Sequence, residues 1–297
     1  MTVVCGTDFS EAAARAVDAA AALAGAWRED LVLVHALEYP GAEEAGSWSL
    51  LEAERKRAGP KLEGEVARLA KAGIPMRTEV RIGASDVELL KVGTSCGARL
   101  LVVGALGRRG GSLWGLGSTA DRVAQTSRLP VLVVRDADPF AEWARGSRTL
   151  QIFVGVDRTP SSDAAVGWVE ELESAGRCHV TCGHVFWPPE VKERLHTKGG
   201  LPLGSGHAEV EKALAGELRA RIEALRGGRA FDLKLLGGLG RPADHLVSLA
   251  TEARADVVVV GAHQRTLISR VWHGSVSRGV IDQAPMNVVC VTDSSKS

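Results

Sequence analysis

The sequence has few aromatic residues, no net charge and few cysteines. Aromatic side chains make up 4% of the 297 residues, which disfavours a surface for stacking single-stranded nucleic acid. Lysine and arginine number 36, as do aspartate and glutamate, so no basic field attracts nucleic acid or an anionic membrane. We therefore expect neither nucleic acid nor a membrane among the partners.

Signals that would direct the chain out of the cytoplasm are also missing. No basic stretch precedes an apolar one near residue 1, and Asp8 and Glu11 interrupt the region where a signal peptide needs its apolar core. The apolar stretch 19–27 is far shorter than the roughly 20 residues that span a bilayer. The cysteines number five and lie mostly in apolar runs, which is typical of reduced thiols. We expect a cytoplasmic protein.

Several enzyme motifs are absent. The chain has no G-x4-G-K-[S/T] P-loop, and neither G-x-S-x-G nor H-E-x-x-H, which disfavours P-loop NTPases and two common hydrolase classes. Residues 115–120 fit the dinucleotide pattern G-x-G-x-x-A, but they do not follow a strand and lack the acidic residue expected about 20 positions later. No general base or nucleophile is evident, so we expect no enzyme.

What the sequence does contain is an alternation of valine-rich runs and amphipathic stretches. Ser10 is a candidate N-cap for one helix, and Ser85 with Glu88 has capping-box spacing at another. The alternation predicts an α/β fold with a parallel sheet and helices on both faces. The expected strands include 32–34, 100–103, 131–134, 152–156, 257–260 and 288–291. The first expected helix begins at residue 10, and the others include 52–71, 85–92, 119–126, 164–172, 209–225 and 243–250.

The two halves of the chain repeat one plan. Gly83, Gly104 and the run 131–134 recur as Gly240, Gly261 and 288–291, an offset of 157 residues. Near the start of each half the offset is 149, which takes Asp8 to Asp157. The repeat predicts a first domain at 1–137, a linker at 138–148 that is polar with proline and glycine, and a second domain at 149–297.

A glycine-rich loop is the strongest functional signal. The motif Gly104-x2-Gly107-x9-Gly117-Ser118 follows a buried strand and leads into a helix, which predicts an anion site of backbone amides and helix dipole. Asp8, at the end of the first strand, lies at the same edge of such a sheet and can accept a hydrogen bond from a ribose or base. The alternatives are that these glycines serve only turn geometry and that Asp8 only caps a helix.

The second half departs from this pattern. It reads Gly261-x2-Gln264-x9-Gly274-Ser275, with glutamine at the position of the second glycine. That side chain either occupies the space of a phosphate, or resists a left-handed backbone, or donates a hydrogen bond to a ligand. Ligand binding in this half therefore stays open.

Cys178, Cys182 and His184 share one side of an expected strand and are of the types that bind zinc. Their run extends over ~20 Å at 3.3 Å per residue, which is too long for one tetrahedral site, so packing is the favoured interpretation. His35 and His184 occupy equivalent strand ends and are interpreted as core or pocket-rim residues. We expect no protein metal site.

The motif, Asp8, the opening 4–11 and the strand 130–134 resemble those of tandem universal stress proteins that bind ATP. The resemblance spans nearly the whole chain, twice. It implies two Rossmann-like domains, related to adenine nucleotide alpha hydrolases, each with a five-stranded parallel sheet of order 3-2-1-4-5. It also implies that the last strands pack the halves as a pseudo-dimer, while a homodimer of chains is left open.

The same resemblance implies the ligand and its contacts: ATP, with Mg²⁺ on the phosphates. Asp8 and the backbone of Ala36 would hold adenosine, Gly83 would line the pocket and the glycine-rich loop would hold the phosphates. Binding would order the loop from Gly107 to Gly117 and change a surface that a partner recognises. The alternatives are a slow ATP-hydrolysing enzyme of the adenine nucleotide alpha hydrolase type and a scaffold with no bound nucleotide. The residues assigned to the first site are Thr7, Asp8, Ala36, Gly83, Gly104, Gly107, Arg108, Gly117, Ser118 and Thr119. Their counterparts are Asp157, Val185, Gly240, Gly261, Gln264, Gly274, Ser275 and Val276.

Overall fold

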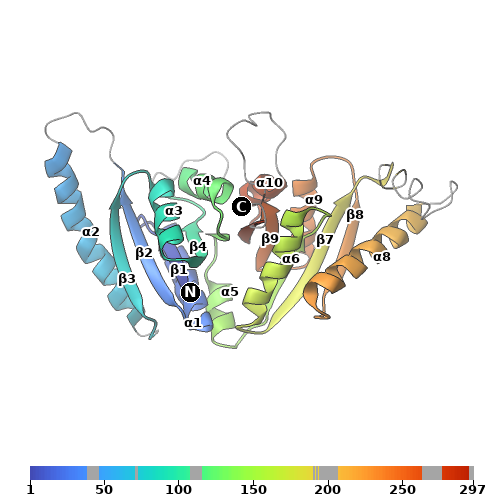
Figure 1. Cartoon of the computed structure of the whole chain (residues 1–297), viewed down its shortest axis with the longest axis horizontal. Helices are drawn as coiled ribbons and strands as arrows, with labels where there is room; N and C mark the ends of the chain where they lie inside the picture. Colours follow the sequence, from blue (N-terminus) through green and yellow to red (C-terminus); the bar gives the residue numbers. More distant parts are fainter. Residues whose placement is uncertain are drawn as a thin grey trace.

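The computed structural model describes residues 1–38, 47–70, 73–107, 116–189, 191, 193, 207–262 and 276–293. Ten strands form one continuous sheet with helices on both faces (Figure 1). The strands are β1 (Thr2–Gly6), β2 (Asp30–Leu37), β3 (Met76–Ile82), β4 (Ala98–Gly104), β5 (Val131–Val134), β6 (Leu150–Gly155), β7 (Cys178–Phe186), β8 (Asp232–Gly237), β9 (Val257–Ala262) and β10 (Asn287–Thr292). The helices are α1 (Glu11–Trp27), α2 (Ser47–Leu69), α3 (Ser85–Ser95), α4 (Ser118–Thr126), α5 (Asp138–Ala144), α6 (Pro160–Glu173), α8 (His207–Arg226), α9 (Pro242–Glu252) and α10 (Val276–Gln283).

The strand order confirms the predicted topology in both halves. The sheet reads β3-β2-β1-β4-β5-β10-β9-β6-β7-β8, so each half has the order 3-2-1-4-5 counted from its own first strand. Within each half the paired strands are parallel. The chain changes direction across the sheet between β1 and β4, and again between β6 and β9. These are the two positions where a sheet of this kind opens a crevice for ligands.

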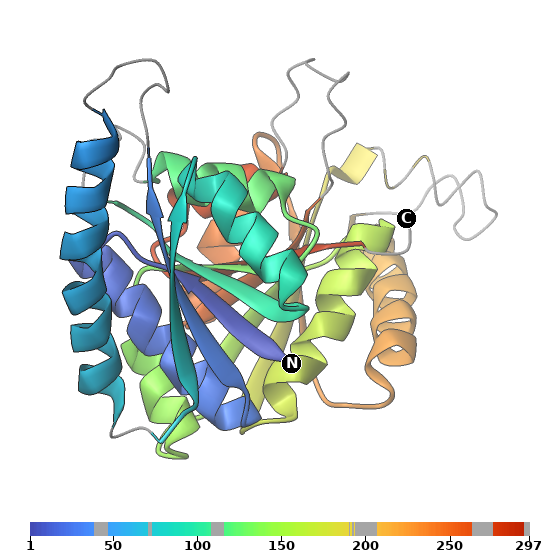
Figure 2. The ribbon, with the colours of Figure 1, turned by 60° about the vertical axis from the view of Figure 1, so that its left-hand side comes forward.

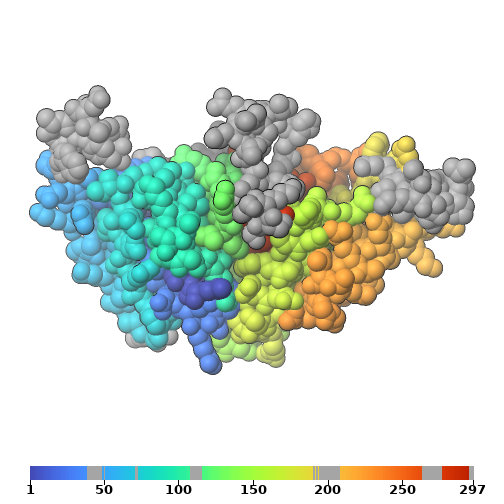
Figure 3. Space-filling view, in the orientation of Figure 1, coloured from blue at the N-terminus to red at the C-terminus, as the bar shows by residue number. Residues whose placement is uncertain are grey.

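The halves are joined through their last strands. β5 and β10 pair antiparallel, and Leu132 lies opposite Val289, its own counterpart 157 residues later. A pseudo-twofold axis therefore passes between these two residues. Figure 2 shows the strands of the two halves continuing through one twisted sheet. The space-filling view shows the first half, blue to green, packed directly against the second (Figure 3).

The strands have apolar residues on both sides because both faces of the sheet are covered. Along β4, Leu100 and Val102 face the core on the side of α1, whereas Leu101 and Val103 face α3 and α4. This continuous burial explains why the central strands are nearly uninterrupted runs of valine and leucine. None of the described helices is long and apolar enough to cross a membrane.

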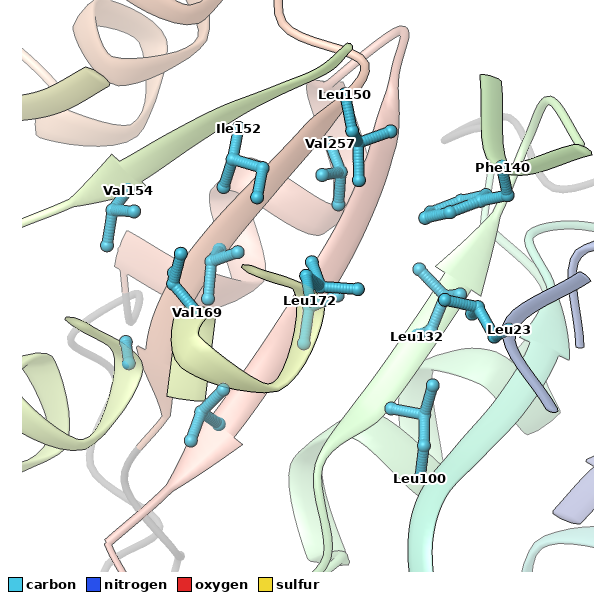
Figure 4. Packing of buried hydrophobic residues seen from close by; sticks show 14 of the residues in the cluster. Leu23, Leu100, Leu132, Phe140, Leu150, Ile152, Val154, Val169, Leu172 and Val257 are labelled. Carbon is cyan, nitrogen blue, oxygen red and sulfur yellow. The ribbon is translucent and has the colours of Figure 1, made fainter. Parts of the chain in front are cut away.

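The segment predicted as a polar linker contains helix α5. Its polar residues lie at the surface, but Phe140 and Trp143 are buried. Figure 4 shows Phe140 beside Leu132 and Leu23, in a core cluster that continues into β6 and α6 of the second half. Phe140 and Trp143 are three residues apart, so both side chains lie on one face of the short helix α5. The connection between the halves is therefore part of the core.

The predicted capping box on α3 is wrong. Ala84 is the N-cap residue, and no side chain caps the helix there. Ser85 Oγ instead donates a hydrogen bond to Glu38 Oε1 at 2.9 Å, and Glu88 Oε1 accepts one from Lys91 Nζ at 2.7 Å. The predicted cap on α1 is confirmed, since Ser10 Oγ accepts from the Ala13 amide at 3.2 Å.

Polar contacts between the halves surround the β5–β10 pair. Asn287 is buried, and its Oδ1 accepts from the amides of Arg135 and Asp136 at 2.9 and 3.1 Å, while its Nδ2 donates to Asp256 O at 3.0 Å. A second polar contact between the halves joins α1 to α6, where Trp27 Nε1 donates to Glu171 O at 2.6 Å. A single amide side chain thus holds the end of β5 against two strands of the second half.

Candidate functional site

The candidate site of the first half lies at the switch point between β1 and β4. A Cβ added to Gly107 would lie 3.0 Å from Asp8 Oδ2, and one added to Gly117 would lie 3.4 Å from the Gly107 nitrogen. Asp8, Gly107 and Gly117 therefore converge, although the last is more than a hundred residues from the first. A Cβ at Gly107 would crowd the carboxylate, whereas one at Gly117 would make an ordinary van der Waals contact with the loop backbone.

The turn after β1 is held by its own polar groups. Asp8 Oδ1 accepts from the Ser10 amide at 3.0 Å, and Thr7 Oγ1 accepts from the Phe9 amide at 3.1 Å. Phe9 has a φ of 63°, which is uncommon for a large side chain and concentrates backbone strain next to Asp8. Its ring packs against His35 with centroids 4.5 Å apart. Ser10 is the N-cap residue of α1, so the interpretation of Asp8 as a cap of that helix is wrong, and Asp8 instead stabilises the turn that precedes it. Its Oδ2 faces the glycine loop.

Helix α4 begins at this site without a side-chain cap. Gly117 is its N-cap residue, and within the described residues no side chain accepts a hydrogen bond from the first turn. The Gly117 amide itself donates to Ala105 O at 2.7 Å. The amides that follow, from Ser118 and Thr119, have no acceptor within the helix, because the first turn of any α-helix lacks one. These donors and the positive end of the helix dipole suit an anion.

The residues assigned to the adenosine end lie on β2 and just after β3. Ala36 is on β2 opposite Arg81 of β3. Gly83 follows β3 with a φ of 145°, a conformation that favours glycine, and a Cβ there would lie 2.9 Å from Glu88 Oε1. His35 is buried, and its Nδ1 is 2.7 Å from Thr7 O, so it fixes the turn that carries Asp8. The rim interpretation of His35 agrees with this contact.

Gly104 has a packing role that the motif did not reveal. A Cβ at this position would lie 2.7 Å from Ala12 O, in the first turn of α1. Gly261 repeats the arrangement, with a Cβ only 2.4 Å from the Ser161 carbonyl. Both glycines are therefore required for a helix to lie on the end of a strand, whether or not a ligand binds.

The second half keeps the framework with different polar contacts. Asp157 Oδ1 accepts from both the amide and the hydroxyl of Thr159 at 2.6 Å. His184 Nδ1 lies 2.6 Å from Val156 O, as His35 does in the first half. Val185 lies on β7, Val276 begins α10, and Gly240 has a φ of 113°. Asp157 thus accepts two hydrogen bonds from one residue of its own turn.

Several assigned residues lie outside the described part of the chain. These are Arg108 in the first half, together with the loop 108–115 that ligand binding was expected to order, and Gln264, Gly274 and Ser275 in the second half. Their contributions, and with them the effect of the glutamine substitution, stay predictions.

The described residues contain no group of three or more His, Cys, Asp or Glu that could hold a metal ion. Cys178 and Cys182 lie on β7 within the second half, and burial raises the pKa of each thiol to about 12. Such thiols stay protonated at neutral pH and are poor nucleophiles. The geometry agrees with a packing role for both.

Comparison with known proteins gives the family. The model of the universal stress protein family matches residues 1–135 and 150–292. A universal stress protein of Methanocaldococcus jannaschii is 28% identical over 137 residues, covering 45% of this chain and 81% of that protein. A universal stress protein of Mycolicibacterium smegmatis is 27% identical over 221 residues, covering 74% of this chain and 69% of that protein. A crystal structure from Archaeoglobus fulgidus, also a universal stress protein, has the same fold with a TM-score of 0.71 at 16% identity, covering 98% of each chain. The chain belongs to the universal stress protein family, with one family segment in each half.

Proposed function

We propose that the first half binds an adenine nucleotide, ATP, and that binding makes the chain a nucleotide-linked regulator. The observation that carries the proposal is the convergence of Asp8, Gly107 and the uncapped start of α4 at the β1–β4 switch point. The amides of α4 would hold phosphate oxygens, and Asp8 would accept a hydrogen bond from ribose or base. Occupancy would stabilise the folded state and favour the conformation that a partner protein recognises.

The metal ion in this proposal belongs to the ligand. Because no described cluster of protein ligands could hold it, Mg²⁺ would be bound by the phosphate oxygens and water, which is its usual preference. It would offset part of the phosphate charge. The protein residues would position the nucleotide through amides and Asp8.

Replacing Gly117 by valine is expected to weaken ATP binding at least about tenfold. The branched side chain would enter the space between Gly107 and the first turn of α4, where a phosphate would lie. Titration calorimetry with ATP and Mg²⁺ measures the effect, and thermal unfolding checks that the variant folds. Gly216→Val on α8 is the matched control and should bind normally, because no described atom lies within 4 Å of an added Cβ there. Binding by Gly117→Val at the wild-type affinity would refute the assigned site.

Hydrolysis of the bound nucleotide is expected to be slow. His35 is buried, and its ring packs against Phe9 with centroids 4.5 Å apart, which keeps bulk water from the imidazole. Asp8 Oδ1 accepts from the Ser10 amide. We therefore expect neither residue to act as an efficient general base toward water. Nucleotide that purifies with the protein should therefore be detected by mass spectrometry largely as ATP. Steady turnover at about 1 s⁻¹, which is common for enzymes, would favour a hydrolase instead.

A further inference from the structure

Asp121 and Arg278 link the two helices that begin at the candidate sites. Asp121 lies in the first turn of α4, and Arg278 lies in the first turn of α10. Arg278 Nη2 donates to Asp121 Oδ2 at 3.2 Å. The two residues are 157 positions apart, so they occupy the same position in the two copies of the repeat. Figure 1 shows α4 and α10 next to each other at the middle of the molecule.

Other charged groups surround this ion pair. Asp121 Oδ1 accepts a hydrogen bond from Gln125 Nε2. Asp282 on α10 is partly buried, and its pKa is raised by burial and by Asp121, against the opposing effect of Arg278. From the end of β5, Arg135 Nη2 donates to Ile281 O at 2.5 Å. Acidic and basic groups from both halves thus meet between the helices, where a change in one charge affects the others.

We propose that Arg278, although it belongs to the second half, supports nucleotide binding in the first half by neutralising Asp121. The proposal rests on the function proposed above. A carboxylate in the first turn of α4 favours the helix but repels a phosphate placed at the same terminus. The guanidinium of Arg278, in hydrogen-bonding contact with that carboxylate, reduces the repulsion. Arg278 is therefore a positioning residue that acts through Asp121.

The test is a double-mutant cycle read out as ATP affinity at low salt. Arg278→Gln should weaken binding about two- to fivefold, the range that partly exposed ion pairs permit. Asp121→Asn should bind at least as tightly as the wild type. In the Asp121→Asn background, Arg278→Gln should change the affinity less than about twofold, because the charge that it neutralises is gone. Raising the salt concentration to about 0.5 M should shrink the effect of Arg278→Gln.

The control is Arg229→Gln, which removes an arginine of similar exposure that pairs with Glu170 in the second half. It should leave ATP affinity unchanged. Wild-type protein that binds no ATP would refute the proposed function itself. If the wild type binds ATP and Arg278→Gln binds it with the same affinity, only the role of Arg278 is refuted. Equal weakening in both Asp121 backgrounds would show that Arg278 acts through the general field and not through Asp121.

Discussion

Glu173→Leu is expected to destabilise the chain by about 3–5 kcal/mol, because it leaves a buried guanidinium without its carboxylate. Arg226, the last residue of α8, has a fully buried side chain. Its Nη2 donates to Glu173 Oε1 at 2.7 Å and to Ala230 O at 3.1 Å. Its Nε and Nη1 have no partner among the described residues. The substitution would therefore leave a positive charge buried without a carboxylate beside it.

Removing the other partner of this ion pair, by Arg226→Met, should destabilise the chain less than Glu173→Leu does. The Glu173 side chain is 16% exposed, in contrast to the fully buried Arg226, and Arg229 Nε lies 3.9 Å from its Oε2, so the carboxylate keeps a second cation although Oε2 itself is buried. Adding Arg226→Met to Glu173→Leu should recover most of the stability, since an apolar pair of similar volume often replaces a buried ion pair without loss. Urea unfolding of all four proteins measures these differences. A double variant no more stable than Glu173→Leu alone would contradict the argument.

Gly261→Ala is expected to destabilise the chain by about 3 kcal/mol, as overpacking in a core does. The added Cβ would lie 2.4 Å from the carbonyl carbon and oxygen of Ser161, which are backbone atoms in the first turn of α6. Helix α6 would have to move away from β9. Gly104→Ala should also destabilise the chain, but by less, because its added Cβ would lie 2.7 Å from the nearest atom, Ala12 O.

Gly167→Ala provides the matched comparison within α6. Nothing lies within 4 Å of an added Cβ at this position, so alanine should stabilise the helix by about 0.5–1 kcal/mol. Thermal or urea unfolding of Gly261→Ala and Gly167→Ala should therefore shift in opposite directions. If Gly261→Ala were as stable as the wild type, the close approach of α6 to β9 would be wrong.

Much of the fold could be predicted because its periodicity is strong. The central strands carry valine and leucine on both sides, as in 100–103 and 257–260, since helices cover both faces. The edge strands β3 and β8 lack such runs, because their side chains are largely exposed or only partly buried. Their polar sequences therefore resemble loops. The helix within the predicted linker gave little signal for a related reason, since the buried residues Phe140 and Trp143 lie in a segment that is otherwise polar with proline and glycine.

The candidate site was predictable in its parts. The glycine spacing and Asp8 indicated an anion site, and the structure brings Asp8, Gly107 and Gly117 together. The spacing did not separate Gly107, which faces Asp8, from Gly104, which is needed for helix packing. Both have the same signature in sequence, a glycine near the end of a strand. Asp121 and Arg278 are opposite charges at equivalent positions of the repeat, which is visible in the sequence. That these positions meet follows only once the twofold axis between the halves is known.

By itself, the sequence determined that two α/β units of one design follow each other and that the first retains the complete glycine motif. Only the tertiary structure decided which chemically similar residues do which task, and which residues of the two halves meet. The physical reason is that periodicity is a local property, recorded in each segment by its side chains. Contacts such as Leu132 with Val289 or Arg226 with Glu173 depend on how distant surfaces pack, and both partners contribute to them.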